Sequence, residues 1–192
     1  LNKTALEVCE GQQYDIDFET KSNIDFNQYL EMIRLKTAVL VGAALQMGAI
    51  VANASDKDQE RIYNFGINLG LAFQLQDDLL DVFGDYDLVG KKIGGDILEN
   101  KKTVLFHMTK SNATKTQTEE LEKLFGTKKI SSELKISKVT SLFKATKADI
   151  RASKLVEDYT NSAIKYIDDL SIEESQKEEF RVFSNELMNR KL

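Results

Sequence analysis

The sequence predicts an all-α protein, and three observations carry that prediction. The chain of 192 residues contains no proline, although average usage would supply roughly ten. Proline breaks helix interiors and is otherwise common in turns and at sheet edges, so its absence favours long, uninterrupted helices. Apolar residues recur at helical spacing over several long segments, and no segment shows the period-two alternation that is typical of a half-buried strand.

The first long helix is predicted to run from about residue 27 to residue 51. Asp25 or Asn27 can cap its start, and apolar side chains follow at helical spacing from Tyr29 onward. A helix so apolar around its circumference is expected to be buried on most sides. Small residues, which let neighbouring helices approach closely, lie between the large ones: Ala38, Gly42, Ala43, Ala44, Gly48, Ala49 and Ala52.

A second central helix is predicted from about residue 58 to residue 83, with Ser55 or Asp56 as its cap. Residues 84–100 hold several glycines with charges between them and are predicted to form a loop. A helix then restarts over residues 103–108.

The rest of the chain is amphipathic and more polar. Residues 116–119 and 171–174 match the Ser/Thr-x-x-Glu pattern of a capping box. Between them, apolar residues from Ile150 to Ile167 mark one face of a helix of about 20 residues. We therefore expect one domain with two buried central helices and amphipathic helices packed around them.

Composition excludes several classes of function. One cysteine, Cys9, rules out a disulfide framework, and one histidine, His107, rules out a His-rich zinc site. The formal net charge of −5 gives no basic footprint for nucleic acid. The first ten residues lack a basic leader, and the longest apolar stretch, residues 37–52, is broken by Gln46 and by glycines. We expect a soluble, cytoplasmic protein with no signal sequence and no membrane span.

The strongest chemical signal is a group of aspartates, Asp77, Asp78 and Asp81. Asp77 and Asp81 share a helical face, and Asp78 lies about 100° around the helix, beside Gln74. Carboxylates so close together repel one another unless they meet water or a cation. Mg²⁺ suits them, because it is usually held by one or two carboxylates plus substrate phosphate oxygens. A solvated acidic face is the alternative that the residues alone leave open.

Two basic features complement the carboxylates. Residues 90–103 combine glycines with lysines, which suits phosphate binding, but match neither a P-loop nor the G-x-G-x-x-G pattern. A solvated loop is the alternative. Lys36 opens a very apolar helix, where it needs an anion or water nearby. A lysine that extends to solvent is the alternative there. Carboxylates could bind Mg²⁺, lysines could bind anionic oxygens, and an apolar interior could bind an apolar chain. Together these features predict a ligand that consists of a diphosphate on an apolar tail.

With these features in order, the sequence resembles the trans-isoprenyl diphosphate synthases, or polyprenyl synthetases. The resemblance rests on four motifs between about residues 11 and 106, whereas about 110–192 carries none and is expected to be structural. The motifs are residues 11–15, like G-Q-x-x-D; 36–37, like the K-T pair; 70–81, like the second aspartate-rich motif G-x-x-F-Q-x-x-D-D-x-x-D; and 90–103, like G-K-x-x-G-x-D…K-x-T.

The resemblance implies an isoprenoid-synthase-type helical bundle and a Mg²⁺-dependent prenyltransferase of isoprenoid biosynthesis. Such an enzyme condenses isopentenyl diphosphate with an allylic prenyl diphosphate, head to tail (1′-4). The resemblance also assigns roles to single residues. Asp77 would bind Mg²⁺ directly and Asp81 would be the second metal residue, with Asp78 assisting. Lys36 and Lys91 would hold the allylic diphosphate, and Lys101 would lie close to it; Thr37 and Gln74 would face the reacting carbons, and Phe73 would line the isopentenyl site.

The match is incomplete before Lys36. The family has two aspartate-rich motifs, and this sequence holds one; an arginine-bearing isopentenyl diphosphate site is also missing. Because Leu1 is the first residue, we expect residues 1–192 to be the C-terminal portion of a longer synthase, homodimeric when full length and inactive alone. A non-catalytic partner subunit and a class I terpene cyclase are the alternatives. The intact aspartates and lysines argue against the first, and the lysine-bearing motifs against the second.

Overall fold

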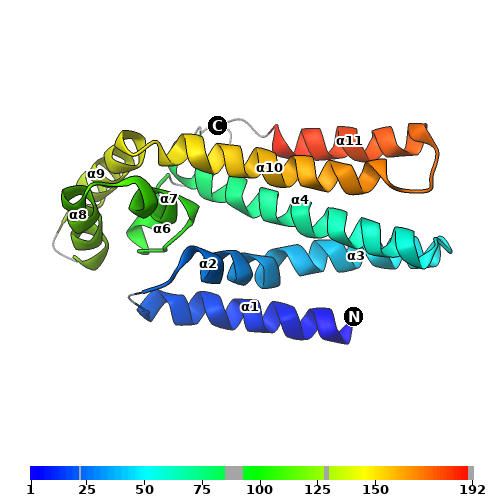
Figure 1. Cartoon of the computed structure of the whole chain (residues 1–192). Coiled ribbons are helices and arrows are strands. Elements are labelled where there is room, and N and C mark those ends of the chain that lie inside the picture. Colours follow the sequence, from blue (N-terminus) through cyan, green and yellow to red (C-terminus); the bar gives the residue numbers. More distant parts are fainter. Residues whose placement is uncertain (22, 85–92, 128–129, 190–192) are drawn as a thin grey trace. The chain divides into compact units, whose positions relative to one another are not determined.

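The computed structural model describes residues 1–21, 23–84, 93–127 and 130–189. Every regular element among these residues is a helix (Figure 1), which confirms the all-α prediction. The helices are α1 (Asn2–Thr20), α2 (Phe26–Ile33), the π-helical η1 (Arg34–Ala38), α3 (Val39–Val51), α4 (Asp56–Phe83), α6 (Gly95–Leu98), α7 (Val104–Asn112), α8 (Lys115–Gly126), α9 (Ser132–Ala145), α10 (Ala148–Asp168) and α11 (Glu174–Met188).

The chain divides into two compact units, and each is described by itself. Among the described residues, the first contains 1–17, 30–74 and 155–189, and the second contains 18–29 and 75–154. The long helices α4 and α10 each contribute residues to both units.

The start of α4 agrees with the predicted cap. The Ser55 hydroxyl oxygen accepts a hydrogen bond from the Asp58 amide at 3.2 Å. Asp58 is itself buried, and its carboxylate accepts from the Arg61 guanidinium at 3.0 Å and from the Ser171 amide at 3.1 Å. From this anchored start α4 continues without a break to Phe83, as the apolar spacing predicts.

Both predicted capping boxes are wrong by a few residues. The box at the start of α8 is formed by residues 114 and 117, not by 116 and 119. The box at the start of α11 is formed by residues 173 and 176, not by 171 and 174. In each case a second possible capping box begins two residues from the predicted one: Thr114 with Gln117, and Glu173 with Gln176. The sequence pattern alone does not decide which of the two boxes forms.

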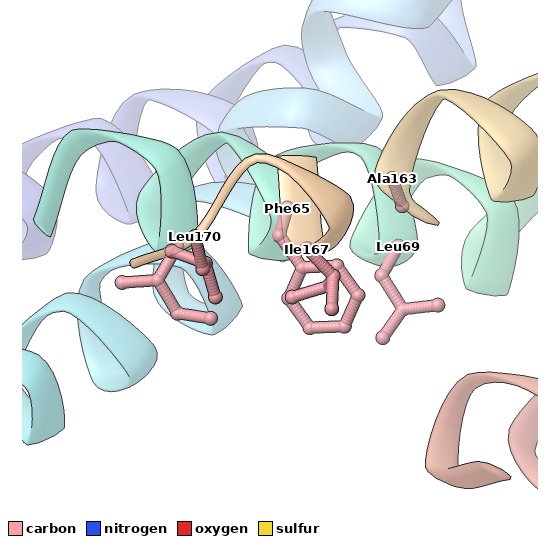
Figure 2. Packing of buried hydrophobic residues seen from close by; sticks show 6 residues of the cluster. Phe65, Leu69, Ala163, Ile167 and Leu170 are labelled. Carbon is pink, nitrogen blue, oxygen red and sulfur yellow. The ribbon is translucent and has the colours of Figure 1, made fainter. Parts of the chain in front are cut away.

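The core of the first unit lies along α4, where it meets α10 and the turn that follows α10 (Figure 2). The Phe65 ring is fully buried and meets Phe180 of α11 edge to face, with the ring centroids 5.7 Å apart. Full burial of an aliphatic or aromatic side chain stabilises a fold by about 1.5–3 kcal/mol. The buried residues of this cluster are Ile62, Phe65, Leu69, Ala163, Ile167 and Leu170.

Glycines on α4 allow η1 and α3 to approach its backbone. A Cβ atom on Gly70 would lie 2.7 Å from the Ala38 Cα, and one on Gly66 would lie 2.6 Å from the Gly42 Cα. Such distances exclude any side chain, so glycine is required at both positions of α4. The paired positions are four residues apart on each helix, and the contact therefore extends over a full helical turn. The small residues do permit the close approach that the sequence predicts.

The run from α2 through η1 to α3 is less buried than predicted. Leu40 is 53% exposed, Ile50 51% and Val51 83%, so burial on most sides is wrong for these positions. By length and composition alone, the helical run Phe26–Val51 would suffice to cross a membrane, and 33% of its apolar window is buried. The core helices of many proteins pass the same test, so this is weak evidence for a span.

Three helices, α1, α6 and α9, are absent from the sequence-based expectation. α1 is polar on nearly all sides, and its buried residues are only Thr4 and Gly11, so it lacks the apolar stripe that marks a helix. The short helix α6 lies inside the segment predicted as a loop.

An aromatic cluster forms part of the core of the second unit. His107, on α7, is 7% exposed. Its ring centroid lies 5.5 Å from that of Tyr29 and 5.7 Å from that of Phe106, and its Nε2 atom is buried without a hydrogen-bond partner among the described residues. Burial lowers the pKa of His107 to about 4, and the nearby Lys110 ammonium acts in the same direction.

The contact at Gly70 can be tested by adding one methyl group. We expect Gly70→Ala to lower the free energy of unfolding by about 1–3 kcal/mol, because the new Cβ atom meets backbone that cannot move aside. Gly48→Ala is the matched control: nothing lies within 4 Å of a Cβ atom there, and replacing a helical glycine should stabilise by about 0.5–1 kcal/mol. Urea denaturation measures both, and a Gly70→Ala protein as stable as the unmodified chain would contradict the contact.

The protonation state of His107 can be measured cleanly, because it is the chain's one histidine. We expect its NMR titration to give a pKa of about 4. Since the folded state favours the neutral ring, the free energy of unfolding should fall as the pH is lowered from about 6.5 towards 4. His107→Gln should remove this part of the pH profile. A measured pKa near 6.5 would show that the ring is not buried as described.

Candidate functional site

The residues that the sequence assigns to a site lie in both compact units, and each group is again described by itself. The first unit holds Lys36, Thr37, Phe73 and Gln74, and the second holds Asp77, Asp78, Asp81 and Lys101. Lys91 lies outside the described residues.

Lys36 lies in the π-helical turn η1 and is tied to α1. Its Nζ atom donates to the Asp15 carboxylate at 2.6 Å, and its side chain remains 37% exposed. Gly11 stands one turn before Asp15 on α1, and a Cβ atom on Gly11 would lie 2.3 Å from the Lys36 backbone nitrogen. Gly11 therefore admits the Lys36 backbone, while Asp15, on the same face of α1, holds the ammonium group. π-helical turns are rare and recur at functional sites.

This arrangement gives a physical reason for two of the sequence motifs. Gly11 and Asp15 are two of the three fixed positions of the G-Q-x-x-D pattern, and both contact Lys36. The sequence alone gives Asp15 no role of its own. The available signal was the spacing of four residues, which places a glycine and an aspartate on one helical face.

Thr37 and Gln74 meet in the same unit. The Thr37 hydroxyl donates to the Gln74 side-chain oxygen at 3.2 Å. Gln74 stands one turn after Gly70 on α4, where the backbone of Ala38 lies close. The glycine contact therefore brings this polar pair into hydrogen-bonding range. Phe73, the preceding residue of α4, is half-buried.

In the second unit, the three aspartates at the end of α4 have different surroundings. Asp78 is 5% exposed, and its Oδ2 atom accepts hydrogen bonds from the Tyr29 hydroxyl at 2.5 Å and from the Val104 amide at 3.3 Å. Asp81 is partly buried and accepts from the Asp96 amide at 3.1 Å. Asp77 is half-buried, as Asp81 is. The sequence pattern makes these aspartates look alike, but the structure does not.

Electrostatics separates Asp81 and Tyr29 from ordinary surface groups. Burial raises the pKa of Asp81 to about 6, and the neighbouring Asp96 carboxylate adds to the effect, against the backbone amides that lower it. Burial, together with the Asp78 carboxylate, raises the pKa of Tyr29 well above its ordinary value, so its hydroxyl stays protonated as a donor. A partly buried carboxylate beside a second carboxylate forms a charge arrangement that a nearby cation would stabilise.

Whether these residues fit Mg²⁺ can be judged from the donors present. Carboxylate oxygens are the ligands that Mg²⁺ prefers. In the part of the chain that the structure describes, no three acidic, histidine or cysteine side chains gather closely enough to form a metal cage. Asp78 and Asp81 already accept hydrogen bonds from within the protein. The donor set fits Mg²⁺ held by Asp77 with water and phosphate oxygens, a common arrangement for this ion.

The adjacent lysines before α7 differ in what they contact. The Lys101 ammonium lies 2.7 Å from the Glu99 carboxylate and 3.3 Å from that of Asp96. These partners raise the pKa of Lys101 despite the opposing effect of burial, so the side chain, still 37% exposed, remains a cation. Lys102 instead donates to the backbone oxygens of Lys21 and Phe18. The ammonium group of Lys101 is therefore held by carboxylates, and that of Lys102 by backbone oxygens.

Comparisons with known proteins place the chain among related sequences. A sequence model described as polyprenyl synthetase matches residues 1–143. A geranylfarnesyl diphosphate synthase of Natronomonas pharaonis is 46% identical over 105 residues, which cover 55% of this chain and 31% of that protein. A geranylgeranyl diphosphate synthase of Sulfolobus acidocaldarius is 35% identical over 171 residues, which cover 89% of this chain and 51% of that protein. The chain thus spans about half the length, or less, of these relatives.

Solved structures give the same answer. The crystal structure of a geranylgeranyl pyrophosphate synthase superposes on this chain with a TM-score of 0.93, at 47% sequence identity. The match covers 100% of this chain and 59% of the synthase chain. A geranylgeranyl pyrophosphate synthase of Corynebacterium glutamicum, solved with isoprenyl diphosphate and magnesium, matches 98% of this chain and 53% of its own with a TM-score of 0.87 at 31% identity. The four motifs, the helical fold and these matches agree: the chain belongs to the polyprenyl synthetase family.

Proposed function

We propose that this chain carries part of the active site of a prenyltransferase of isoprenoid biosynthesis. The enzyme joins isopentenyl diphosphate to an allylic prenyl diphosphate by head-to-tail 1′-4 condensation. The observation that carries this proposal is the arrangement at η1, where the Lys36 ammonium is held by Asp15 and Thr37 meets Gln74. The names of the relatives, which are geranylgeranyl and geranylfarnesyl diphosphate synthases, support the substrate class.

Lysine side chains bind the anionic end of the substrate. Lys36 has three N–H donors, of which one goes to Asp15, and its exposure lets a phosphate oxygen accept from another. Because Asp15 holds the ammonium in place, less side-chain freedom is lost when the substrate binds. Lys101, which also remains charged and partly exposed, binds in the same manner. Lys91 has this role by its place in the sequence motif.

Asp77 holds Mg²⁺ together with water and substrate oxygens. When bound, the ion supplies positive charge that stabilises the departing diphosphate. Asp81 remains a second metal residue of the proposal, and in its present contacts it fixes the start of α6 through the Asp96 amide. Asp78 assists from a buried position, without exposing its own carboxylate.

Thr37 and Gln74 act on the reacting carbons. The hydroxyl proton of Thr37 is donated to Gln74, so the lone pairs of the Thr37 oxygen point elsewhere. Those lone pairs place partial negative charge where it favours an allylic cation. Phe73 contributes apolar surface to the isopentenyl site, and apolar surface keeps water away from the cation. We also propose a homodimeric full-length enzyme and a cytoplasmic location.

The chain alone is expected to yield no elongated product. Its sequence holds one aspartate-rich motif where the proposed chemistry uses two. Incubation with Mg²⁺, radiolabelled isopentenyl diphosphate and an allylic diphosphate, followed by product extraction, measures this directly. Elongated prenyl diphosphate formed at the rate of a complete synthase would contradict the expectation.

The catalytic roles can be tested in a chimera in which this chain replaces the matching region of the Sulfolobus acidocaldarius geranylgeranyl diphosphate synthase. We expect the chimera to form product, and Lys36→Met or Asp77→Asn each to lower kcat by at least about 100-fold, because each removes charge that stabilises the departing anion. Lys57→Met and Asp56→Asn, exposed positions at the start of α4, are the matched controls. A folded chimera without activity, or one that tolerates the first two changes as well as the controls, argues against the proposal.

A further inference from the structure

We infer that Tyr29 is a positioning residue for the metal-binding end of α4, and that it acts through Asp78. The inference deepens the proposed function and rests on it, because it concerns the end of α4 that carries Asp77. In the sequence, Tyr29 is only one of the apolar residues at helical spacing. The structure gives its hydroxyl a specific partner in the aspartate-rich motif.

The contact between Tyr29 and Asp78 is short and fully enclosed. Tyr29 is 2% exposed and Asp78 is 5% exposed. The hydroxyl oxygen lies 2.5 Å from the carboxylate oxygen, a separation typical of a hydroxyl that donates to an ionised acceptor. Such bonds are stronger than those between neutral groups, and a buried carboxylate that loses a donor is left poorly solvated. The tyrosine hydroxyl is therefore part of what keeps Asp78 in its present orientation.

The same carboxylate oxygen also supplies the missing cap of α7. The residue before that helix, Thr103, makes no side-chain capping bond, and the first amides of a helix have no partner within it. Asp78 accepts from the first of these amides, that of Val104, at 3.3 Å. A negative charge at a helix start is favourable in addition to the bond itself. Asp78 thus caps α7 from α4.

One oxygen atom therefore joins three segments of the second unit. Tyr29 lies near the start of α2, Asp78 near the end of α4 and Val104 at the start of α7. Two residues with proposed roles are attached directly to this junction: Asp77 precedes Asp78 on α4, and Lys101 stands three residues before Val104. Without the hydroxyl of Tyr29, the Asp78 carboxylate should reorient, and both neighbours should lose their fixed positions.

The experiment compares Tyr29→Phe with Tyr159→Phe in the 192-residue chain. The control removes the same hydroxyl from a half-buried tyrosine of α10 that makes no hydrogen bond within the described ranges. Calorimetry measures the dissociation constant for inorganic pyrophosphate in the presence of Mg²⁺, and NMR hydrogen exchange follows the Val104 amide. We expect Tyr29→Phe to raise the dissociation constant by about tenfold or more and to speed exchange at Val104, whereas Tyr159→Phe changes neither.

A purely structural role would alter thermal stability and exchange but not the affinity of the folded protein. Tyr29→Phe protein that binds as tightly as the unmodified chain overturns the inference, and so does an equal loss in Tyr159→Phe. If Tyr29→Phe does not fold, 3-fluorotyrosine at position 29 keeps the hydroxyl while changing its acidity; an altered dissociation constant then supports the inference and an unaltered one overturns it. If the unmodified chain binds no pyrophosphate in the presence of Mg²⁺, the proposed function itself is contradicted. If the unmodified chain binds pyrophosphate and Tyr29→Phe does not weaken that binding, only the inference about Tyr29 fails.

Discussion

The close approach of three backbones around η1 is the constraint on which the first part of the candidate site depends. Gly11 of α1 admits the Lys36 backbone, and Gly70 of α4 admits that of Ala38. A side chain at either glycine would push the helices apart by more than a hydrogen bond can tolerate. Because η1 is fixed by backbone contact, the side chains that leave it reach partners on α1 and α4 at fixed separations. The ion pair between Lys36 and Asp15 and the hydrogen bond between Thr37 and Gln74 are therefore consequences of the glycine positions.

In the second unit, burial decides what each aspartate can do. Asp78 is enclosed and serves as an acceptor for a hydroxyl and a helix start. Asp81 binds a backbone amide and carries a raised pKa beside Asp96. Asp77 retains exposure, which a metal with several water ligands requires. A motif of three similar charges in the sequence thus combines a proposed metal ligand with two residues that bind the surrounding chain.

The sequence was informative where burial leaves a periodic pattern and uninformative where structure depends on distant contacts. The long helix α4 follows from its apolar spacing. The helix α1 has almost no apolar stripe, and the π-helical turn at Lys36 has no known sequence signature, so neither could be predicted. The role of Tyr29 depends on a partner 49 residues away, which spacing does not reveal. The motifs select candidate site residues, whose roles stay predictions, but they do not show which carboxylate is buried. Among these residues, Lys91 also lies outside the described part of the chain.

The central proposal is that Asp77, near the end of α4, is the metal ligand of the second unit, whereas Asp78 is bonded to Tyr29 and to the start of α7. A crystal structure of the chain grown with Mg²⁺ and inorganic pyrophosphate tests it most directly. We expect a metal ion on the Asp77 carboxylate, with Asp78 still bonded to Tyr29. A metal ion bound without Asp77, or one held by Asp78 in place of its contact with Tyr29, would contradict the proposal.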